Sequence, residues 1–365
     1  MSGKINKALL PLSWLYGLGV WVRNKLFDWR FLPVETFDAP IISVGNLAAG
    51  GTGKTPHTEY LIRLLKRRYR VAVLSRGYKR KTRGFILADE HADSHSIGDE
   101  PCQMHRKFPD VTVAVDSNRR RGIRNLLDFP ETQRPEVILL DDAFQHRYVK
   151  PSLSILLTDS RRPFDEDYLL PAGRLREPAR NAKRADIVVF TKQVQMTKQP
   201  SAQADLTFNS QFAYKGLLPV FPEKSAAQKE NMERLKKESF SFLLLTGLAH
   251  PEDLIQYLEK YTSRLQTMIY PDHHDFSRKD ILKITNIFNR IPNKDKLIIT
   301  SEKDAARLTH NPHIGEEIKG SIYYAPIEVV FEPEEEKLFI QKIENHVTNF
   351  KRNRIVAETT DTRKH

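Results

Sequence analysis

The first apolar stretch of the chain runs from Ala8 to Val22 and contains a single serine. It ends at Arg23 after 15 residues, whereas a helix that spans a bilayer needs about 20. Trp14 and Trp21 lie seven residues apart and therefore share one face of a helix. Because tryptophan favours the boundary between membrane and water, the pattern predicts an interfacial, membrane-associated helix within residues 1–30. A helix packed on the protein's own core is the alternative that the pattern leaves open.

Short apolar segments follow, separated by segments in which apolar residues have helical spacing. The strand-like segments are 40–44, 71–75, 111–115, 137–140, 153–157 and 187–190. Alternating strands and helices predict an α/β fold with a parallel sheet and helices on both faces, here in a domain at residues 31–211. In such sheets, ligands bind at the carboxyl ends of the strands.

The second half of the chain repeats this pattern on a smaller scale. Residues 240–246 and 296–300 have the composition of buried strands, and a helical segment follows residue 251. We therefore expect a second, smaller α/β domain at residues 212–350. Residues 351–365 are polar and charged, which predicts a disordered tail.

A glycine-rich loop, GNLAAGGTGKTP at residues 45–56, joins the first strand to a helical segment. Strand, loop and helix in this order form the context of a P-loop, whose backbone N–H groups and helix N-terminus bind the phosphates of a nucleotide. Ala48 departs from the usual G-x4-G-K-T pattern at its first glycine, but alanine is small enough to be tolerated. The predicted nucleotide-binding residues are Gly50, Gly51, Thr52, Gly53, Lys54, Thr55 and Pro56.

Two residues of this loop carry much of the expected chemistry. Lys54 can reach the β- and γ-phosphates, and the Thr55 hydroxyl can bind Mg²⁺. The strand at 137–140 leads into Asp141 and Asp142, where P-loop proteins hold a carboxylate near the metal. Alone, this aspartate pair would indicate only a solvent-exposed turn, but after a P-loop it predicts a metal site.

The composition of the 365-residue chain is ordinary for a folded protein, and its length suggests two domains. The net charge of +12 favours an acidic partner, such as an anionic lipid or a phosphorylated substrate. We expect no nucleic acid partner, because no basic stretch is interleaved with aromatic residues. Cys102 is the only cysteine, which excludes an internal disulfide and fits a reducing cytoplasm.

Six further motifs occur in a distinctive order. They are SRGY at 75–78, GDEP at 98–101, DDAFQHR at 141–147, LPAGRLREP at 170–178, PDHHDF at 271–276 and TSEKDA at 300–305. Together with the glycine-rich loop, this set resembles the tetraacyldisaccharide 4′-kinases of lipid A biosynthesis, from the N-terminal apolar helix to about Asp304. The resemblance implies Mg²⁺-assisted transfer of the γ-phosphate of ATP to the 4′-hydroxyl of an acylated disaccharide 1-phosphate. The product would be the bisphosphorylated lipid A precursor, lipid IVA.

The resemblance also implies roles for individual residues. Asp99 looks like the base that accepts the proton of the 4′-hydroxyl, and a carboxylate suits that task. A histidine of the Asp-His-His segment, either His273 or His274, would support catalysis. Taken alone, Asp99 would be interpreted as a helix N-cap and the two histidines as part of a polar loop. The metal-side carboxylates that the resemblance implies are Asp141, Asp142 and Glu177.

Basic and aromatic residues near these motifs could neutralise or contact the phosphates of ATP or of the lipid. The candidate substrate residues are Arg76, Tyr78, Arg119 and Arg174. Arg76 is favoured because it follows a strand, whereas the run at 119–121 could equally begin a solvated helix. The resemblance further suggests a two-stranded hinge, formed by 212–221 and 322–331, whose closure would exclude water from the site.

The lipid substrate implies an enzyme at the cytoplasmic face of the bacterial inner membrane, peripheral or monotopic, with no obligate protein partner evident. The main alternative is a membrane-associated P-loop ATPase switch of the Min/Par type, but those proteins carry a lysine where this chain has Ala49. A GTPase is less favoured, because TKQV at 191–194 lacks the aspartate of the N/T-K-x-D motif that reads the base.

Overall fold

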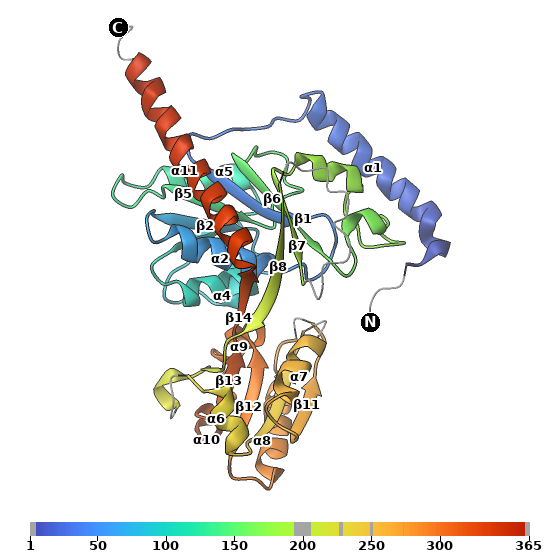
Figure 1. Ribbon diagram of the computed structural model, residues 1–365, viewed down its shortest axis with the longest axis vertical. Helices are drawn as coiled ribbons and strands as arrows, with labels where there is room; N and C mark the ends of the chain where they lie inside the picture. Colours follow the sequence, from blue (N-terminus) through green and yellow to red (C-terminus); the bar gives the residue numbers. More distant parts are fainter. Residues whose placement is uncertain (1–4, 193–205, 226–228, 249–250, 273, 362–365) are drawn as a thin grey trace. The chain divides into compact units, whose positions relative to one another are not determined.

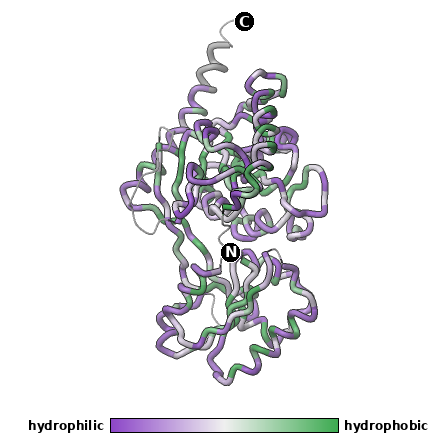
Figure 2. Tube along the Cα trace, turned by 90° about the vertical axis from the view of Figure 1, so that its right-hand side faces the viewer, coloured by the Kyte–Doolittle hydropathy of each residue, from purple (hydrophilic) through white to green (hydrophobic). Residues whose placement is uncertain are grey.

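Two compact units make up the chain (Figure 1). The computed structural model describes residues 5–192, 206–225, 229–248, 251–272 and 274–361, with side chains to residue 353. The first unit contains the residues up to Phe212 and those from Val329 onward, and the second contains Ala213–Glu328. Hydrophobic stretches lie mainly toward the inside of each unit, while hydrophilic ones gather along its outside (Figure 2).

The first unit is built on a nine-stranded sheet with the order β14-β8-β7-β6-β1-β5-β2-β4-β3. Its elements are η1 (Lys7–Leu9), α1 (Leu10–Asp28), β1 (Ile41–Asn46), α2 (Lys54–Leu65), β2 (Val71–Ser75), β3 (Ile86–Leu87), α3 (Ser94–Ile97), α4 (Asp99–Lys107), β4 (Thr112–Val115), α5 (Arg119–Leu127), β5 (Val137–Asp141), β6 (Leu153–Asp159), η2 (Phe164–Glu166), η3 (Ala179–Arg184), β7 (Ile187–Thr191), β8 (Leu206–Tyr214), β14 (Ile327–Phe331) and α11 (Pro333–Asp361). The strands from β8 to β4 are parallel, and β3 is antiparallel to β4. The predicted α/β fold with a parallel sheet is confirmed.

Side chains along the central strands alternate between two cores, because successive residues of a strand point to opposite faces. In β1, Ile42 and Val44 pack with α2, α4 and α11, whereas Ile41 packs with α5. In β5, Leu139 joins the first core and Ile138 the second. Helices therefore cover both faces of the sheet, as the sequence pattern predicts, and the strand ends at one edge carry the site.

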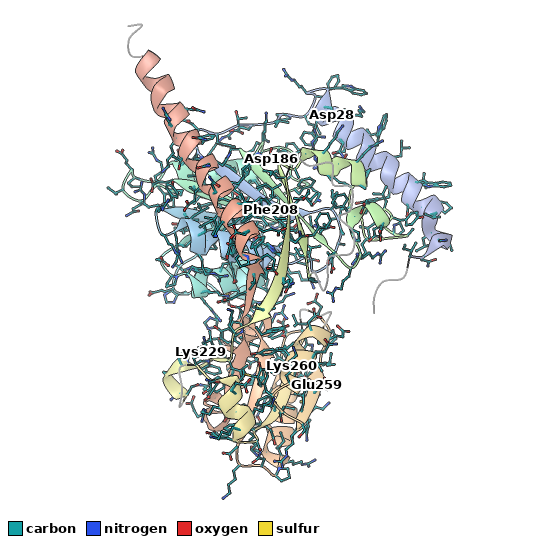
Figure 3. The ribbon with its side chains drawn as sticks, in the orientation of Figure 1. Asp28, Asp186, Phe208, Lys229, Glu259 and Lys260 are labelled. Atoms are coloured by element: carbon teal, nitrogen blue, oxygen red, sulfur yellow. The ribbon has the colours of Figure 1, made fainter. Side chains whose placement is uncertain are left out.

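The last part of the chain returns to the first unit, unlike the expected second domain at 212–350. Strand β14 pairs with β8, and Phe339, Ile343 and Val347 of α11 join the core on one face of the sheet. Figure 3 places Phe208 of β8 beside α11, where its ring lies 5.2 Å from that of Phe339. The tail expected to be disordered from residue 351 instead continues α11 to Asp361. Extending an existing helix is far less costly than nucleating one, which explains why a polar sequence remains helical there.

The second unit has a five-stranded sheet with the order β11-β10-β12-β13-β9. Its elements are β9 (Leu218–Pro219), η4 (Pro222–Lys224), α6 (Met232–Lys237), β10 (Ser241–Thr246), α7 (Glu252–Glu259), β11 (Leu265–Ile269), α8 (Arg278–Arg290), β12 (Lys296–Ser301), α9 (Glu302–Leu308), α10 (Glu316–Lys319) and β13 (Ile322–Ala325). Helices α8, α9 and α10 cover one face, and α6 and α7 cover the other. The chain passes between the two units twice, once in β8 and once in β14.

Candidate active site

The glycine-rich loop lies between β1 and α2, where the sequence predicts a P-loop. Gly50 and Gly53 adopt φ angles of +117° and +85°, which glycine reaches at little cost. A Cβ atom on Gly53 would lie only 2.2 Å from Cζ of Phe212, so this ring closes the back of the loop. The buried Thr52 accepts a hydrogen bond of 2.8 Å from Nδ2 of Asn46. This backbone, held at the N-terminus of α2, suits a phosphate group.

A second loop, the LPAGRLREP motif, pairs with the P-loop through its backbone. The N–H of Ala49 donates a 2.7 Å hydrogen bond to the carbonyl oxygen of Arg174, and the N–H of Arg176 donates a 2.8 Å bond to that of Leu47. An antiparallel bridge at Ala48 lies between these two bonds. Sequence reasoning missed this pairing, because main-chain bonds leave no side-chain signal.

Lys54, the first residue of α2, faces the aspartate pair at the end of β5. Its Nζ lies 3.6 Å from Oδ1 of Asp142, and NH1 of Arg176 lies 3.4 Å from Oδ2 of the same carboxylate. Burial raises the pKa of Asp142, but the two cations outweigh it and hold this pKa below its ordinary value. Asp142 also has a positive φ of 46°, which is uncommon for a non-glycine residue and occurs at functional sites.

Asp141 is the last residue of β5 and is almost completely buried. Its Oδ2 accepts a 3.1 Å hydrogen bond from Ser75, and its Oδ1 accepts a 3.4 Å bond from Thr58. Burial, together with the charges of Asp142 and Glu100, raises the pKa of Asp141 to about 6. An added cation would favour the ionised form of this carboxylate.

The end of β5 fits a Mg²⁺ ion that is bound together with a nucleotide. Oδ1 of Asp142 is buried and accepts no hydrogen bond from the residues that the structure describes. Among those residues, no group of three or more His, Cys, Asp or Glu is arranged to hold a metal. Mg²⁺ usually binds one or two carboxylates from the protein, and substrate phosphates and waters supply its other ligands. Asp141, Asp142 and the Thr55 hydroxyl would be suitable as the ligands from the protein.

Glu177, the third expected metal-side carboxylate, is 1% exposed and surrounded by basic and amide groups. Its Oε2 accepts hydrogen bonds of 2.5 Å from Arg184 and 2.8 Å from Asn181. Its Oε1 lies 3.7 Å from NH1 of Arg23 and accepts no hydrogen bond within the described part of the chain. The arginines balance the buried charge, and one oxygen keeps its capacity for a further ligand.

Asp99 is the first residue of α4, and Gly98 is the N-cap, so the N-cap interpretation of Asp99 is wrong. The partly exposed Asp99 lies in the first helical turn with Glu100, where the helix dipole favours negative charge. Gly98 has a φ of +93°, and a Cβ there would lie 3.1 Å from the carbonyl oxygen of Tyr78. The SRGY and GDEP motifs therefore meet at the start of this helix.

The candidate substrate residues have different surroundings. Arg76 and Tyr78 are exposed after β2. Arg119 is 2% exposed and donates hydrogen bonds of 2.5 and 3.0 Å to the carbonyl oxygens of Asp116 and Asp141. Its burial lowers its pKa to about 10. Arg119 is therefore not part of a solvated helix start, and it supports the main chain at the end of β5.

Two basic side chains near the P-loop are paired with aspartates. Nε of Arg174 donates a 2.9 Å hydrogen bond to Asp167. Nζ of Lys192, just after β7, donates a 2.6 Å bond to the carbonyl oxygen of Gly51 and lies 3.0 Å from Asp159. Sequence reasoning considered Lys192 only as part of a base-reading motif and missed its contact with the P-loop.

The Asp-His-His segment belongs to the second unit and lies between β11 and α8. Nε2 of His274 is 3.1 Å from Oδ2 of Asp280, and the imidazole stacks on Tyr270 with a centroid distance of 4.6 Å. NH1 of Arg307 donates a 3.3 Å hydrogen bond to the carbonyl oxygen of His274. His273 lies outside the described residues. His274 thus has contacts that order its own loop.

Helix α1 packs on the second loop of the site with one face. The hydroxyl of Tyr16 donates a 2.9 Å hydrogen bond to the carbonyl oxygen of Arg176, and Phe27 is buried. At the end of the helix, Asp28 forms a 2.8 Å ion pair with Arg147 (Figure 3). The alternative of a helix packed on the protein is confirmed for this face.

The opposite face of α1 is apolar and exposed. Its exposed side chains are Leu12, Trp14, Leu15, Leu18, Trp21 and Val22. Among the described residues, no helix combines the length and apolar character that crossing a membrane requires. The helix therefore presents apolar side chains over a packed inner face.

Comparisons with known proteins agree with these features along almost the whole chain. A model of the tetraacyldisaccharide-1-P 4′-kinase family matches residues 5–347. The tetraacyldisaccharide 4′-kinase of Parabacteroides distasonis is 53% identical over 94% of this chain and 95% of its own. That of Bacteroides thetaiotaomicron is 48% identical over 97% of each chain.

A solved structure supports the same relationship. The crystal structure of the apo form of LpxK from Aquifex aeolicus in complex with ATP is 30% identical, with a TM-score of 0.74. The match covers 94% of this chain and 98% of that one. These matches set aside the Min/Par-type alternative, and the chain belongs to the tetraacyldisaccharide-1-P 4′-kinase family.

Proposed function

We propose that this chain transfers the γ-phosphate of ATP to the 4′-hydroxyl of tetraacyldisaccharide 1-phosphate and so produces lipid IVA. One observation carries the proposal: the P-loop Lys54 lies 3.6 Å from Asp142 in a chain of the 4′-kinase family. A phosphate-binding lysine beside a carboxylate at a strand end is the arrangement that phosphoryl transfer needs. The relative from Aquifex aeolicus was crystallised with ATP, which supports ATP as the donor.

On the nucleotide side, Lys54 would exchange Asp142 for the β- and γ-phosphate oxygens. Asp142 would then serve the metal together with Asp141 and the Thr55 hydroxyl, and Glu177 would contribute through its Oε1. Mg²⁺ held there would neutralise charge that develops on the phosphates. Arg176, which lies 3.4 Å from Asp142, would keep that carboxylate oriented after Lys54 leaves it.

On the acceptor side, Asp99 would accept the proton of the 4′-hydroxyl. It lies in the first turn of α4, and a carboxylate is the type of group that can accept this proton. Of the two histidines, His274 is held by Asp280 and Tyr270. We propose that one histidine of this segment, His273 or His274, supports catalysis. Arg76, Tyr78 and Arg174 remain the candidates for contact with the substrate.

The lipid would reach this site along helix α1. The exposed apolar face of the helix suits an interfacial position, and its inner face contacts the loop that carries Arg176 and Glu177. We propose a peripheral or monotopic position at the cytoplasmic face of the inner membrane, with α1 in contact with lipid. The net charge of +12 would favour an anionic membrane surface.

The direct experiment supplies the purified full chain with labelled ATP, Mg²⁺ and a tetraacyldisaccharide 1-phosphate in detergent. We expect a bisphosphorylated lipid that carries the label at the 4′-position. A Lys54→Met variant should bind the acceptor but form almost no product. Well-folded wild-type protein that hydrolyses ATP without labelling the lipid would contradict the proposal.

A further inference from the structure

His57 is the fourth residue of α2 and is 3% exposed, although none of the motifs includes it. Its Nδ1 is 2.8 Å from the carbonyl oxygen of Gly53, and its Nε2 is 3.0 Å from the hydroxyl of Ser210 in β8. A carbonyl oxygen can only accept, so Nδ1 carries the proton and Nε2 accepts from the serine. Both ring nitrogens are therefore used, and the tautomer is fixed by the two partners.

The carbonyl that His57 binds belongs to the residue just before the P-loop lysine. The oxygen of Gly53 accepts two bonds from His57, one from the ring and one of 3.2 Å from the main-chain N–H. Because a trans peptide points its C=O and N–H in opposite directions, fixing this oxygen also fixes the N–H of Lys54. That N–H belongs to the start of α2, where a P-loop binds phosphate.

The surroundings of the imidazole hold it in place from the far side. Its centroid lies 5.9 Å from that of Phe212 and 6.3 Å from that of Phe331, both in edge-on geometry. Phe212 is also the ring that closes the back of Gly53. The ring of Phe212 thus lies against both the imidazole and Gly53. The position of the Gly53–Lys54 peptide therefore depends on the hydrogen bond from His57 and on this ring.

We propose that His57 is a positioning residue for ATP: its Nδ1–H aims the Gly53–Lys54 peptide at the nucleotide phosphates. The role goes beyond the proposed function, since it concerns how the P-loop is held and not which group is phosphorylated. His57 acts through the Gly53 carbonyl and does not touch the reacting atoms.

Three substitutions separate the ring bond to Gly53 from the packing. In His57→Asn the amide nitrogen takes the place of Nδ1, so the bond to Gly53 is kept and the bond to Ser210 is lost. In His57→Gln the amide reaches the place of Nε2, so the bond to Ser210 is kept and the bond to Gly53 is lost. His57→Phe keeps the volume and loses both. The readout is the Kd for Mg·ATP, measured by calorimetry without any lipid, so it does not depend on the acceptor.

Loss of a buried hydrogen bond of this kind should weaken ATP binding by roughly tenfold in His57→Gln and His57→Phe. His57→Asn should stay within about threefold of the wild type, and kcat at saturating ATP should change little in all three. His346→Phe is the control, because Nε2 of His346 in α11 makes an equivalent 2.9 Å bond to Ser152. It should lower the melting temperature without changing the Kd for ATP.

The proposal is overturned if His57→Asn binds ATP as weakly as His57→Phe, since packing alone would then explain the loss. It is equally overturned if His57→Phe binds within twofold (roughly 0.4 kcal/mol) of the wild type. An equal loss of affinity in His346→Phe would show a general effect of stability and would also contradict it. Failure to phosphorylate the lipid, with ATP binding as expected, would contradict only the proposed function.

Discussion

At the scale of single residues, the site contains ionisable groups whose pKa values are set by their surroundings. Asp141 and Asp142 are neighbours, yet burial raises the pKa of Asp141 while Lys54 and Arg176 hold that of Asp142 below its ordinary value. The sequence indicated Lys54 and the aspartate pair, because their residue types have fixed roles in P-loops. It did not indicate His57, because a histidine four residues after a glycine is an ordinary helical residue until its buried partners are known.

Gly53→Ala should abolish ATP binding. The φ of +85° strains an L-residue, and the added Cβ would lie 2.2 Å from Phe212. The measurement is the Kd for Mg·ATP by calorimetry. Gly19→Ala in α1, outside the loop, is the control, since a Cβ there meets nothing within 4 Å. An alanine at Gly53 that leaves the Kd unchanged would show that the loop tolerates rearrangement.

Asp99→Asn should lower kcat by roughly 10²- to 10⁴-fold, because the amide cannot accept the proton of the 4′-hydroxyl. The KM for ATP should stay within about twofold, since Asp99 is assigned to the acceptor. Steady-state kinetics with varied ATP measure both constants, and exposed Asp128→Asn serves as control. Weakened ATP binding with unchanged turnover would refute the assignment of the base.

His57 also makes stability depend on pH. Burial lowers its pKa from 6.5 to about 4, so between these values the unfolded chain binds a proton that the folded chain rejects. The free energy of unfolding should therefore fall by about 1.4 kcal/mol for each pH unit from 6.5 down to 4. Denaturant titrations of the wild type and His57→Phe at pH 7 and pH 5 measure this difference. If the free energy of unfolding falls equally in both proteins between pH 7 and pH 5, His57 is not the source of the pH dependence.

At the scale of elements, the predicted strands agree with the structure because each is a short apolar run with clear boundaries. Strands β2, β5, β6 and β7 lie where their segments were expected. The pairing of the LPAGRLREP loop with the P-loop was not predictable, because main-chain hydrogen bonds depend on shape and not on side-chain pattern. The sequence left open whether helix α1 packs on the protein or lies at a membrane surface. In the structure, one face of the helix packs on the protein and the opposite face is apolar and exposed.

Replacing Trp14 and Trp21 by serine should weaken membrane binding while leaving the fold intact, because the two side chains are 71% and 40% exposed. Co-sedimentation with vesicles that contain anionic lipid measures the effect, and the melting temperature checks the fold. Leu282→Ser in α8 removes an apolar side chain of similar exposure, 55%, and should not change vesicle binding. Equal losses in both variants would argue against α1 as the contact.

At the scale of the whole molecule, the chain leaves the first unit after Phe212 and returns at Val329. Two α/β units could be predicted from the alternation of strands and helices. The resemblance suggested that 212–221 and 322–331 join the units, but the pairing of β14 with β8 in the first sheet could not be predicted, because β8 lies more than a hundred residues earlier. The partner of a strand depends on residues far away in the sequence, so it cannot be predicted from local composition.

Phe339→Ala should destabilise the first unit by about 3–5 kcal/mol, although the residue follows the second unit in sequence. Its ring is 2% exposed and packs against Phe208, Phe331 and Tyr60. Denaturant unfolding measures the change in the free energy of unfolding. Repeating it with ATP, which should stabilise only the unit that binds it, identifies the transition of the first unit. Leu338→Ala, at a position 59% exposed, should stay within about 0.5 kcal/mol. A small effect at Phe339 would mean that α11 docks only loosely.

The return of β14 and α11 to the first sheet has a consequence for synthesis on the ribosome. Residues 213–328 are contiguous and can fold as soon as they emerge, whereas the first unit lacks an edge strand and a covering helix until its last residues are translated. Phe331, which supports His57 behind the P-loop, is among these late residues. A nascent chain should therefore acquire its nucleotide affinity only after β14 and α11 have emerged, later than the contiguous second unit can fold.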